Sequence, residues 1–309
     1  MKIEFHADDF GLFNSQTASM KELIDKGAIH GVSVMGNVKL SDDDIRFLSA
    51  RDDLQISVHL NLIEGSPCCS EMKAVSLLVN DQRMLSSSFL KLLLISLLPE
   101  ASRKRQKYKK QIQNELEAQI QNICAQIPGL RDNMRLDSHA HYHCIPIVFE
   151  ALADLICNHK YNVTYLRITK ESFSPYWGSH VRLINVIKQI VLRLCIRNNI
   201  RYSRTKSGID HLIDHMQGDC SFYGVVKSGE MKNDAVSMIL DYQKKKHDTP
   251  YVEILFHPGE SLVSEEIKSL TNEGDRKFWL SPDRRTEFYT LLNIQKNGIY
   301  KLTPEKHLR

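Results

Sequence analysis

The sequence has no apolar segment long enough to cross a bilayer as a helix. Its most apolar run, residues 89–98, is interrupted by Lys91 and falls short of the roughly 20 residues that a membrane-spanning helix needs. The first residues, MKIEFHADDF, lack the apolar core of a secretory signal. The 7 cysteines include no CxxC pair, a usage typical of reduced thiols. We therefore expect a cytoplasmic protein.

Nucleotide-binding motifs and a strong excess of charge are also missing. There is no GxGxxG and no GxxxxGK[ST], so the sequence predicts neither dinucleotide nor P-loop chemistry. The net charge of +4 is a mild excess and does not indicate a nucleic-acid partner. The 309 residues contain no internal repeat and no low-complexity linker. A single elaborated domain over residues 1–309 is the expected organisation.

Short apolar segments alternate with amphipathic helical patterns along most of the chain. Strand patterns recur at residues 2–7, 29–36, 54–62, 133–139, 162–168 and 251–259. Helical patterns lie between them, including residues 41–50, where Ser41 is the expected N-cap. A helical insertion is expected at about residues 63–132, with its strongest helix at 111–127. This alternation predicts an α/β fold with a parallel sheet and helical crossovers.

Two basic segments each permit more than one interpretation. Residues 103–110 are strongly basic and follow the apolar run 89–98. A packed helix followed by a solvated helix start is the commoner use of this pattern, and a helix in peripheral contact with an anionic membrane surface is the alternative. Residues 182–201 are predicted to form a basic helix. Its charged face is either exposed to solvent or attracts an anionic substrate such as a phosphate-linked sugar.

Polar and ionisable residues end five of the predicted strands or, for the first strand, directly follow it. They are Asp8 and Asp9, His59 and Asn61, Asp137 and His139, Arg167, and Glu253 and His257. In parallel α/β folds, and above all in β/α barrels, functional groups gather at the carboxyl ends of the strands. A carboxylate and two imidazoles suit a metal site that leaves positions open for water and substrate. A neighbouring aspartate as base and a further histidine as acid would complete a hydrolase.

The stretch LDSHAHYHC, residues 136–144, places His139, His141 and His143 at alternate positions. On an extended strand, alternate side chains share one face. Three imidazoles on one face are typical of a metal or substrate site, and they are an unusual choice for a hydrophobic core. We therefore expect this stretch to line the site.

Five segments, in order along the chain, resemble the signature of the YdjC-like carbohydrate deacetylases. They are ADDFG at 7–11, VHLNL at 58–62, LDSHAHYH at 136–143, YLRI at 165–168 and EILFHPG at 253–259. This family includes enzymes that remove acetyl groups from chitooligosaccharides and from hopanoid-linked N-acetylglucosamine. The resemblance implies a distorted TIM-like (β/α) barrel with helical insertions. It also implies hydrolysis of the N-acetyl group of a sugar, either an oligosaccharide or a carrier-linked substrate.

Roles for individual residues follow from this resemblance. Asp9, His59 and His139 would bind one divalent metal ion, Asp8 would be the general base, and His257 would be the general acid. The identity of the metal stays open between magnesium, which the family suggests, and zinc, which the ligand types suit. Family members are often dimers, so the expected partners are an N-acetylated sugar and a second copy of the chain.

Six further residues are expected to bind substrate or to orient the ligands: Asn61, Asp137, His141, His143, Arg167 and Glu253. His141 and His143 would orient a ligand or touch the sugar, and a ligand set of His139 with His143 stays open. Asp137 would hold a ligand histidine or cap the loop. Arg167 would anchor a carboxylate or the substrate, or would be a surface charge. Glu253 would pair with His257 or with the backbone.

Other interpretations of the chain also stay open. The remaining histidines, His6 included, are interpreted as structural. The alternative function is a metallohydrolase of another bond, a phosphoester or an amide, on the same barrel. A non-catalytic sugar-binding protein is disfavoured, because it would have no need of Asp8 beside a metal ligand.

Overall fold

The computed structural model describes residues 1–159, 161–206, 209, 212, 220–246, 250–260, 262, 266 and 273–297. Its centre is a seven-stranded sheet in the order β5-β4-β3-β2-β1-β7-β6, and each neighbouring pair of strands is parallel. The strands are β1 (Lys2–Phe10), β2 (Gly31–Met35), β3 (Gln55–Leu60), β4 (Met134–Ser138), β5 (Val163–Leu166), β6 (Cys220–Tyr223) and β7 (Tyr251–Phe256). The expected parallel α/β architecture is confirmed.

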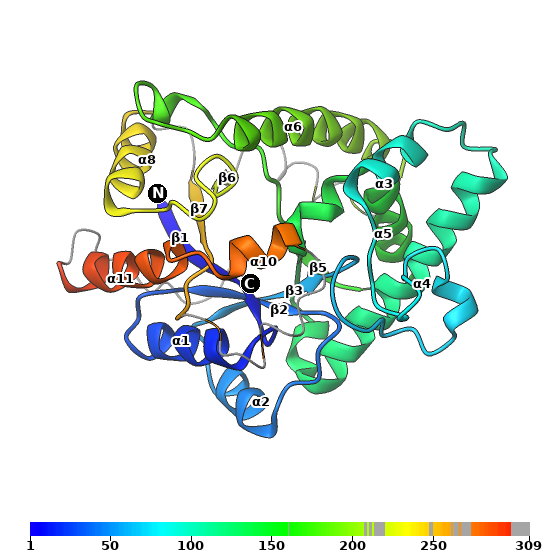
Figure 1. Ribbon diagram of the computed structural model, residues 1–309, viewed down its shortest axis with the longest axis horizontal. Coiled ribbons are helices and arrows are strands. Elements are labelled where there is room, and N and C mark those ends of the chain that lie inside the picture. Colours follow the sequence, from blue (N-terminus) through cyan, green and yellow to red (C-terminus); the bar gives the residue numbers. More distant parts are fainter. Residues whose placement is uncertain are drawn as a thin grey trace.

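Helices surround this sheet (Figure 1). They are α1 (Asn14–Asp25), α2 (Asp42–Ser49), α3 (Phe89–Ser96), α4 (Arg103–Gln126), α5 (Pro146–His159), α6 (Leu183–Ser203), α8 (Asn233–Lys246), α10 (Glu273–Trp279) and α11 (Asp283–Lys296). Short 3-10 turns are η1 (Met72–Val75), η2 (Pro128–Arg131), η3 (His139–Cys144) and η4 (Ser174–Tyr176). Helices α1, α2, α8 and α11 lie around one half of the sheet, and α3 to α6 lie around the other half. Most strand residues are buried and apolar, and buried polar side chains such as Glu4 and His6 pair with one another inside the protein.

Side-chain contacts across the interior show that the sheet curls toward a barrel. Tyr165 of β5 donates a hydrogen bond to Glu253 of β7. Arg167, just after β5, donates from Nε to the same carboxylate at 2.7 Å. Five strand spacings separate β5 from β7 in the sheet order, which would place them roughly 24 Å apart in a flat sheet. The expected distorted TIM-like barrel is therefore confirmed.

The segment between β3 and β4 contains η1, α3, α4 and η2. The apolar positions of α4, among them Ile112, Leu116, Ile120 and Ile123, are fully buried, as their spacing predicts. Ser41 caps α2 as expected, since its Oγ accepts a hydrogen bond from the Asp44 amide at 3.1 Å. No described helix has the length and the apolar content that crossing a membrane requires. The division of the chain into one domain stays a prediction.

The expectation that an extended backbone over residues 136–144 places His139, His141 and His143 on one face is wrong. β4 ends at Ser138, and residues His139–Cys144 form η3. Ala140 and His141 have φ values of 49° and 64°, in the left-handed region. The three histidines therefore leave the chain in different directions and do not share one face.

Candidate active site

A β-bulge brings two consecutive aspartates to the same site. Between Ala7 and Phe10 the register of β1 against β2 shifts, and Asp9 has a φ of 73°. In a regular strand, Asp8 and Asp9 would point to opposite faces. Here the His59 Nε2 atom lies 3.8 Å from Asp8 Oδ2 and 3.2 Å from Asp9 Oδ1. The bulge thus places two carboxylates beside one imidazole.

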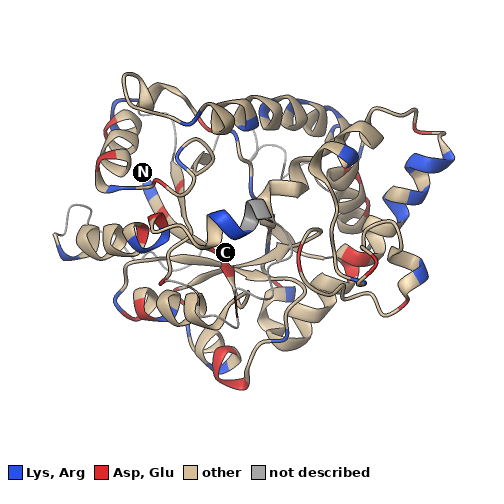
Figure 2. Ribbon diagram, viewed as in Figure 1, with Lys and Arg blue, Asp and Glu red and all other residues tan. Residues whose placement is uncertain are grey.

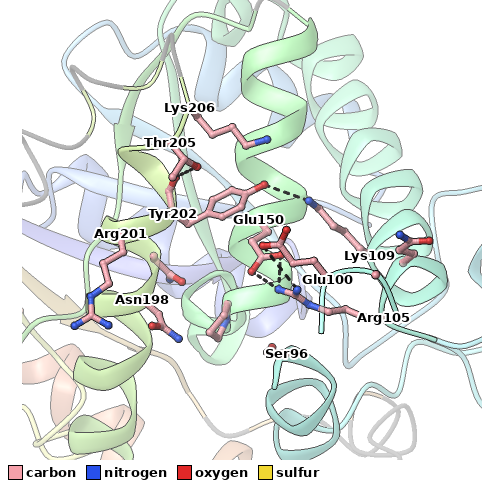
Figure 3. A pocket seen from close by; sticks show the side chains of 14 residues that line it. Ser96, Glu100, Arg105, Lys109, Glu150, Asn198, Arg201, Tyr202, Thr205 and Lys206 are labelled. Atoms are coloured by element: carbon pink, nitrogen blue, oxygen red, sulfur yellow. Dashed lines mark hydrogen bonds and ion pairs between the residues drawn. The ribbon is translucent and has the colours of Figure 1, made fainter. Parts of the chain in front are cut away.

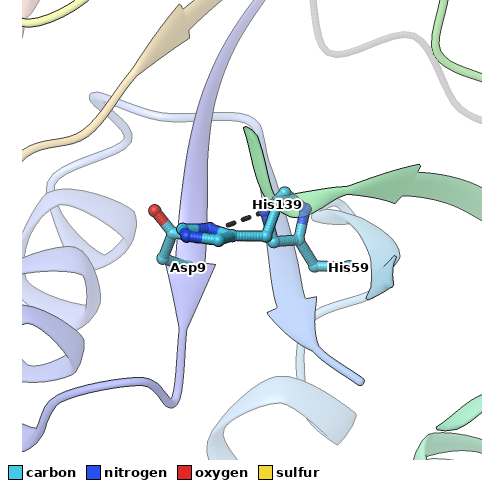
Figure 4. A group of neighbouring side chains, drawn as sticks. All are labelled: Asp9, His59 and His139. Atoms are coloured by element: carbon cyan, nitrogen blue, oxygen red, sulfur yellow. Dashed lines mark hydrogen bonds and ion pairs between the residues drawn. The ribbon is translucent and has the colours of Figure 1, made fainter. Parts of the chain in front are cut away.

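Asp9, His59 and His139 meet at the carboxyl ends of β1, β3 and β4 (Figure 4). One potential ligand atom from each residue lies within 4.8 Å of the other two, and all three residues are buried. His139 Nδ1 is 2.6 Å from Asp9 Oδ1. The second oxygen, Asp9 Oδ2, is buried and has no hydrogen-bond partner in the described part of the chain. A carboxylate with an unused oxygen beside two imidazoles fits a divalent cation.

The electrostatics of this cluster keep its carboxylate charged. Burial favours the neutral acid, but the imidazoles of His139 and His59 hold the pKa of Asp9 well below its usual range. Burial also opposes charge on His59, yet Asp8 and Asp137 raise the pKa of His59 to about 10. In both residues the attraction between carboxylate and imidazole outweighs the effect of burial, and a bound cation would replace that attraction.

Two neighbours fix the orientation of the cluster's histidines. Asp137 Oδ1 lies 2.6 Å from His59 Nδ1, which leaves the His59 Nε2 atom directed at Asp9. Of its two expected alternatives, Asp137 therefore takes the one that holds a histidine. The indole of Trp279, at the end of α10, stacks on the His139 ring with centroids 6.3 Å apart and planes 8° apart.

Arg167 joins three acidic residues inside the barrel. Its Nη1 lies 2.9 Å from both carboxylate oxygens of Asp8, and its Nη2 lies 2.8 Å from Asp137 Oδ2. Its Nε lies 2.7 Å from Glu253 Oε1, so the guanidinium contacts three carboxylates. Because Arg167 is 0% exposed, its interpretation as a surface charge is wrong. Glu253 pairs with Arg167 and Tyr165, so the expected pairing with His257 or with the backbone is also wrong.

His143 is committed to structural contacts. Its Nδ1 lies 2.6 Å from Ser138 Oγ, and its Nε2 lies 2.9 Å from the Arg167 carbonyl oxygen. Among the described residues, the group at this site that could hold a metal ion is Asp9, His59 and His139, without His143, and a ligand set that includes His143 stays an untested alternative. Burial lowers the pKa of His143 to about 4, although Asp137 opposes this shift.

His141, His257 and Asn61 occupy three different surroundings. The His141 ring packs on Phe222 with centroids 5.7 Å apart, and burial holds the pKa of His141 well below its usual range. His257 packs against Phe278, and burial lowers its pKa to about 4 against the opposing charges of Asp9 and Asp8. Asn61 Oδ1 accepts a hydrogen bond from the Ile63 amide at 2.9 Å, so this side chain shapes the loop after β3.

The structure adds residues that the sequence reasoning did not select. His6 bridges Glu4 and Ser33, with its Nδ1 2.5 Å from Glu4 Oε1 and its Nε2 2.7 Å from Ser33 Oγ. Ser33 Oγ in turn donates to Asp137 Oδ2 at 2.5 Å. Glu4, His6 and Asp8 alternate along β1, and that alternation of ionisable residues was the available signal. Trp279 follows no motif, and nothing in its local sequence indicates its contact with His139.

Two cavities of similar size lie outside the cluster. A groove of about 1020 Å³ adjoins it, lined by Ala140 and Tyr142 of η3 together with Ile63, Phe89 and Ile187. The other, of about 1030 Å³, lies among α3, α4, α5 and α6 (Figure 3). Its main charges pair with each other, since Arg105 Nη2 donates to both oxygens of Glu150 at 2.6 and 2.8 Å. Only the groove shares η3 with the candidate site.

Comparisons with known proteins find relatives over nearly the full length of the chain. The family model described as YdjC-like protein matches residues 2–294. A carbohydrate deacetylase from Danio rerio is 26% identical, covering 97% of this chain and 95% of that protein. A carbohydrate deacetylase from Xenopus laevis is 24% identical, with 94% and 91% covered. A solved structure of a proposed cellobiose-phosphate cleavage protein from Enterococcus faecalis superimposes with a TM-score of 0.63 at 18% identity, over 96% and 95% of the two chains. That likeness supports the barrel-like fold.

Proposed function

Because the chain belongs to the YdjC-like protein family, we propose that it is a metal-dependent hydrolase that removes the N-acetyl group from an acetylated sugar. The convergence of Asp9, His59 and His139 beside an Arg167-bound Asp8 is the observation that carries this proposal. The two vertebrate relatives named carbohydrate deacetylase support the choice of substrate class. The metal, magnesium or zinc, stays a prediction.

Asp9, His59 and His139 would hold the cation. The buried Asp9 Oδ2 has no hydrogen-bond partner in the described residues, and the His59 Nε2 atom faces the same point. Asp137 would keep His59 in the tautomer that presents a lone pair on Nε2. A bound divalent ion would polarise the acetamide carbonyl and lower the pKa of a water molecule.

Asp8 would accept the proton of the attacking water. Arg167 donates hydrogen bonds to both of its oxygens, so the carboxylate cannot rotate away from the cluster. The base therefore has a fixed direction, and general-base catalysis depends on such positioning.

His257 would deliver a proton to the departing amine, which leaves poorly as an anion. Its lowered pKa of about 4 makes the imidazole neutral at pH 7 in the free protein. The proton that His257 delivers would therefore be the one that Asp8 takes from the attacking water, passed on to the imidazole within the catalytic cycle. Trp279 and Phe278 pack on His139 and His257, respectively, and would exclude water from both rings.

Acetate release from free and carrier-linked N-acetylglucosamine compounds, with and without a chelator, tests this function. We expect activity that chelation abolishes and a divalent ion restores. Asp8→Asn should lower kcat by about 10²- to 10⁴-fold. Asp52→Asn, which changes an exposed acid in the loop before β3, is the matched control and should leave kcat unchanged. Activity that survives thorough chelation would overturn the proposal, and release of phosphate in place of acetate would favour the alternative hydrolase. A homodimer and a cytoplasmic location stay predictions.

A further inference from the structure

Helix α6 presents apolar side chains to solvent as well as to the core. Leu183, Ile187, Ile190 and Leu194 are each between 47% and 73% exposed, and they recur at spacings of four, three and four residues. That spacing places them in one stripe along the helix. The opposite side of α6 buries Leu192 and other residues against the barrel. A helix that is apolar on two sides normally has a second apolar or interfacial partner.

Helix α3 repeats this pattern. Leu90, Leu94 and Leu97, the last just beyond the end of the helix, are exposed at the same spacing, whereas Leu92 and Ile95 are buried. Together α3, with Leu97, and α6 carry eight of the twelve exposed large hydrophobic side chains in the described residues. Such a concentration marks an interaction surface, because exposed apolar residues on a monomer are usually scattered singly.

The groove beside the active site joins these two helices. Phe89, the first residue of α3, lines it together with Ile184 and Ile187 of α6. Ala140, which follows the candidate ligand His139, lines it as well. Ile187 of the α6 stripe therefore lines a groove whose wall also contains Ala140, the residue next to the candidate ligand His139.

The charges on α3 and α6 themselves have a single sign, and the exposed acid Glu100 lies between α3 and α4. α6 contains Lys188, Arg193, Arg197 and Arg201 and no acidic residue. α3 contains Lys91 and likewise no acid. Figure 2 shows the basic residues of α6 and of the first turns of α4, where Arg103, Lys104, Lys107 and Lys110 are exposed. Apolar side chains bordered by basic ones match a bilayer surface that carries anionic lipid.

We propose that the face formed by α3, α6 and the first turns of α4 docks on an anionic membrane surface. A second copy of the chain would fit this face less well than a membrane. Its α6 also lacks acidic residues, so the basic residues of the two copies would repel one another. A membrane supplies both the apolar phase and the opposite charge. The docked orientation brings the groove beside His139 to the lipid surface.

Vesicle co-sedimentation of the full chain tests this docking. We expect binding to phosphatidylcholine vesicles that contain about 30% phosphatidylserine, with little binding to pure phosphatidylcholine. Ile190→Ser with Leu194→Ser should lower the partition coefficient about tenfold or more. These positions do not line the groove. Arg197→Gln with Arg201→Gln should lower it by about fivefold per charge, and added salt should have the same effect.

Matched variants outside the proposed face show whether a loss of vesicle binding is specific to that face or follows from any loss of exposed apolar or charged side chains. Tyr289→Ser removes a similarly exposed apolar side chain from α11, and Lys245→Gln with Lys246→Gln removes two exposed charges from α8. Both should bind the anionic vesicles like the unaltered chain, and circular dichroism confirms folding. Equal binding of the α6 variants, no binding by the unaltered chain, or equal binding to neutral vesicles would overturn the proposal. A dimer in light scattering that Ile190→Ser with Leu194→Ser dissociates would also overturn it, because a second copy would then cover this face.

Discussion

Arg167 holds both carboxylate oxygens of Asp8 through a single nitrogen, at 2.9 Å each. The same guanidinium reaches Asp137, which orients His59, and it also reaches Glu253 on β7. The fully buried Arg167 side chain thus connects Asp8, the candidate base, to Asp137, which orients the candidate metal ligand His59. The acids around Arg167 are equally buried. Removing the guanidinium would therefore leave the negative charges of several buried carboxylates without a positive partner.

Arg167→Lys tests this linkage. A lysine keeps the charge but cannot reproduce three directed contacts from a planar fork. We expect kcat to fall on the order of 10²-fold, since the base loses its fixed direction. The free energy of unfolding should fall by about 3–5 kcal/mol, since buried acids lose partners. Steady-state kinetics and urea unfolding measure the two effects.

Arg46→Lys serves as the control, because the Arg46 side chain is 74% exposed and makes only a distant pair with Asp43. It should change neither kcat nor stability measurably. Wild-type kcat in Arg167→Lys would show that Asp8 does not depend on this guanidinium for its position.

Asp137→Asn addresses the orientation of His59. The change removes the charge that lies 2.6 Å from His59 Nδ1, and the amide accepts that proton less strongly. Metal affinity should fall about 10- to 100-fold, which is the usual cost of losing a partner that orients a ligand. Isothermal titration with zinc or magnesium measures the dissociation constant. Asp132→Asn, at an exposed position before β4, should bind metal like the unaltered chain. Unchanged affinity in Asp137→Asn would remove His59 from the ligand set.

The sequence predicted the parallel strands and most of the polar residues at their ends, because both follow from local periodicity and strand polarity. Glu253 is the exception, since it is the third residue of β7 and pairs in register with Glu4 near the start of β1. It did not predict the bulge at Asp9, since a register shift depends on the neighbouring strand β2. The turn at His141 was missed for a related reason. Alternation in LDSHAHYHC is compatible with a strand, and only the left-handed backbone of two residues shows otherwise. The contact of Trp279 with His139 joins segments 140 positions apart, which no local pattern records.

The pH dependence of stability tests whether His143 is a buried structural histidine. In the folded chain, burial lowers the pKa of His143 from 6.5 to about 4. Between these two values the unfolded state binds more protons than the folded state, so the free energy of unfolding rises with pH. The stabilising contribution is fully present above pH 6.5 and is lost as the pH falls to about 4. Its size is on the order of 3 kcal/mol. His257 contributes with the same sign, because its pKa is also lowered to about 4.

Urea unfolding of the metal-free chain at several pH values across this window measures the effect, with and without His143→Asn. The variant should be less stable at pH 7, since it loses contacts with Ser138 and the Arg167 carbonyl. Its stability should also depend less steeply on pH. The slope that remains should combine other buried histidines such as His257 with Glu287, whose pKa is raised to about 7 by burial and whose contribution has the opposite sign. His180→Asn, at an exposed position, should keep the full slope. His59 does not obscure the window, because its pKa of about 10 means that its contribution is lost only as the pH rises above 6.5. An unchanged slope in His143→Asn would mean that this histidine already binds its proton in the folded state, and its two short contacts would then belong to a charged ring.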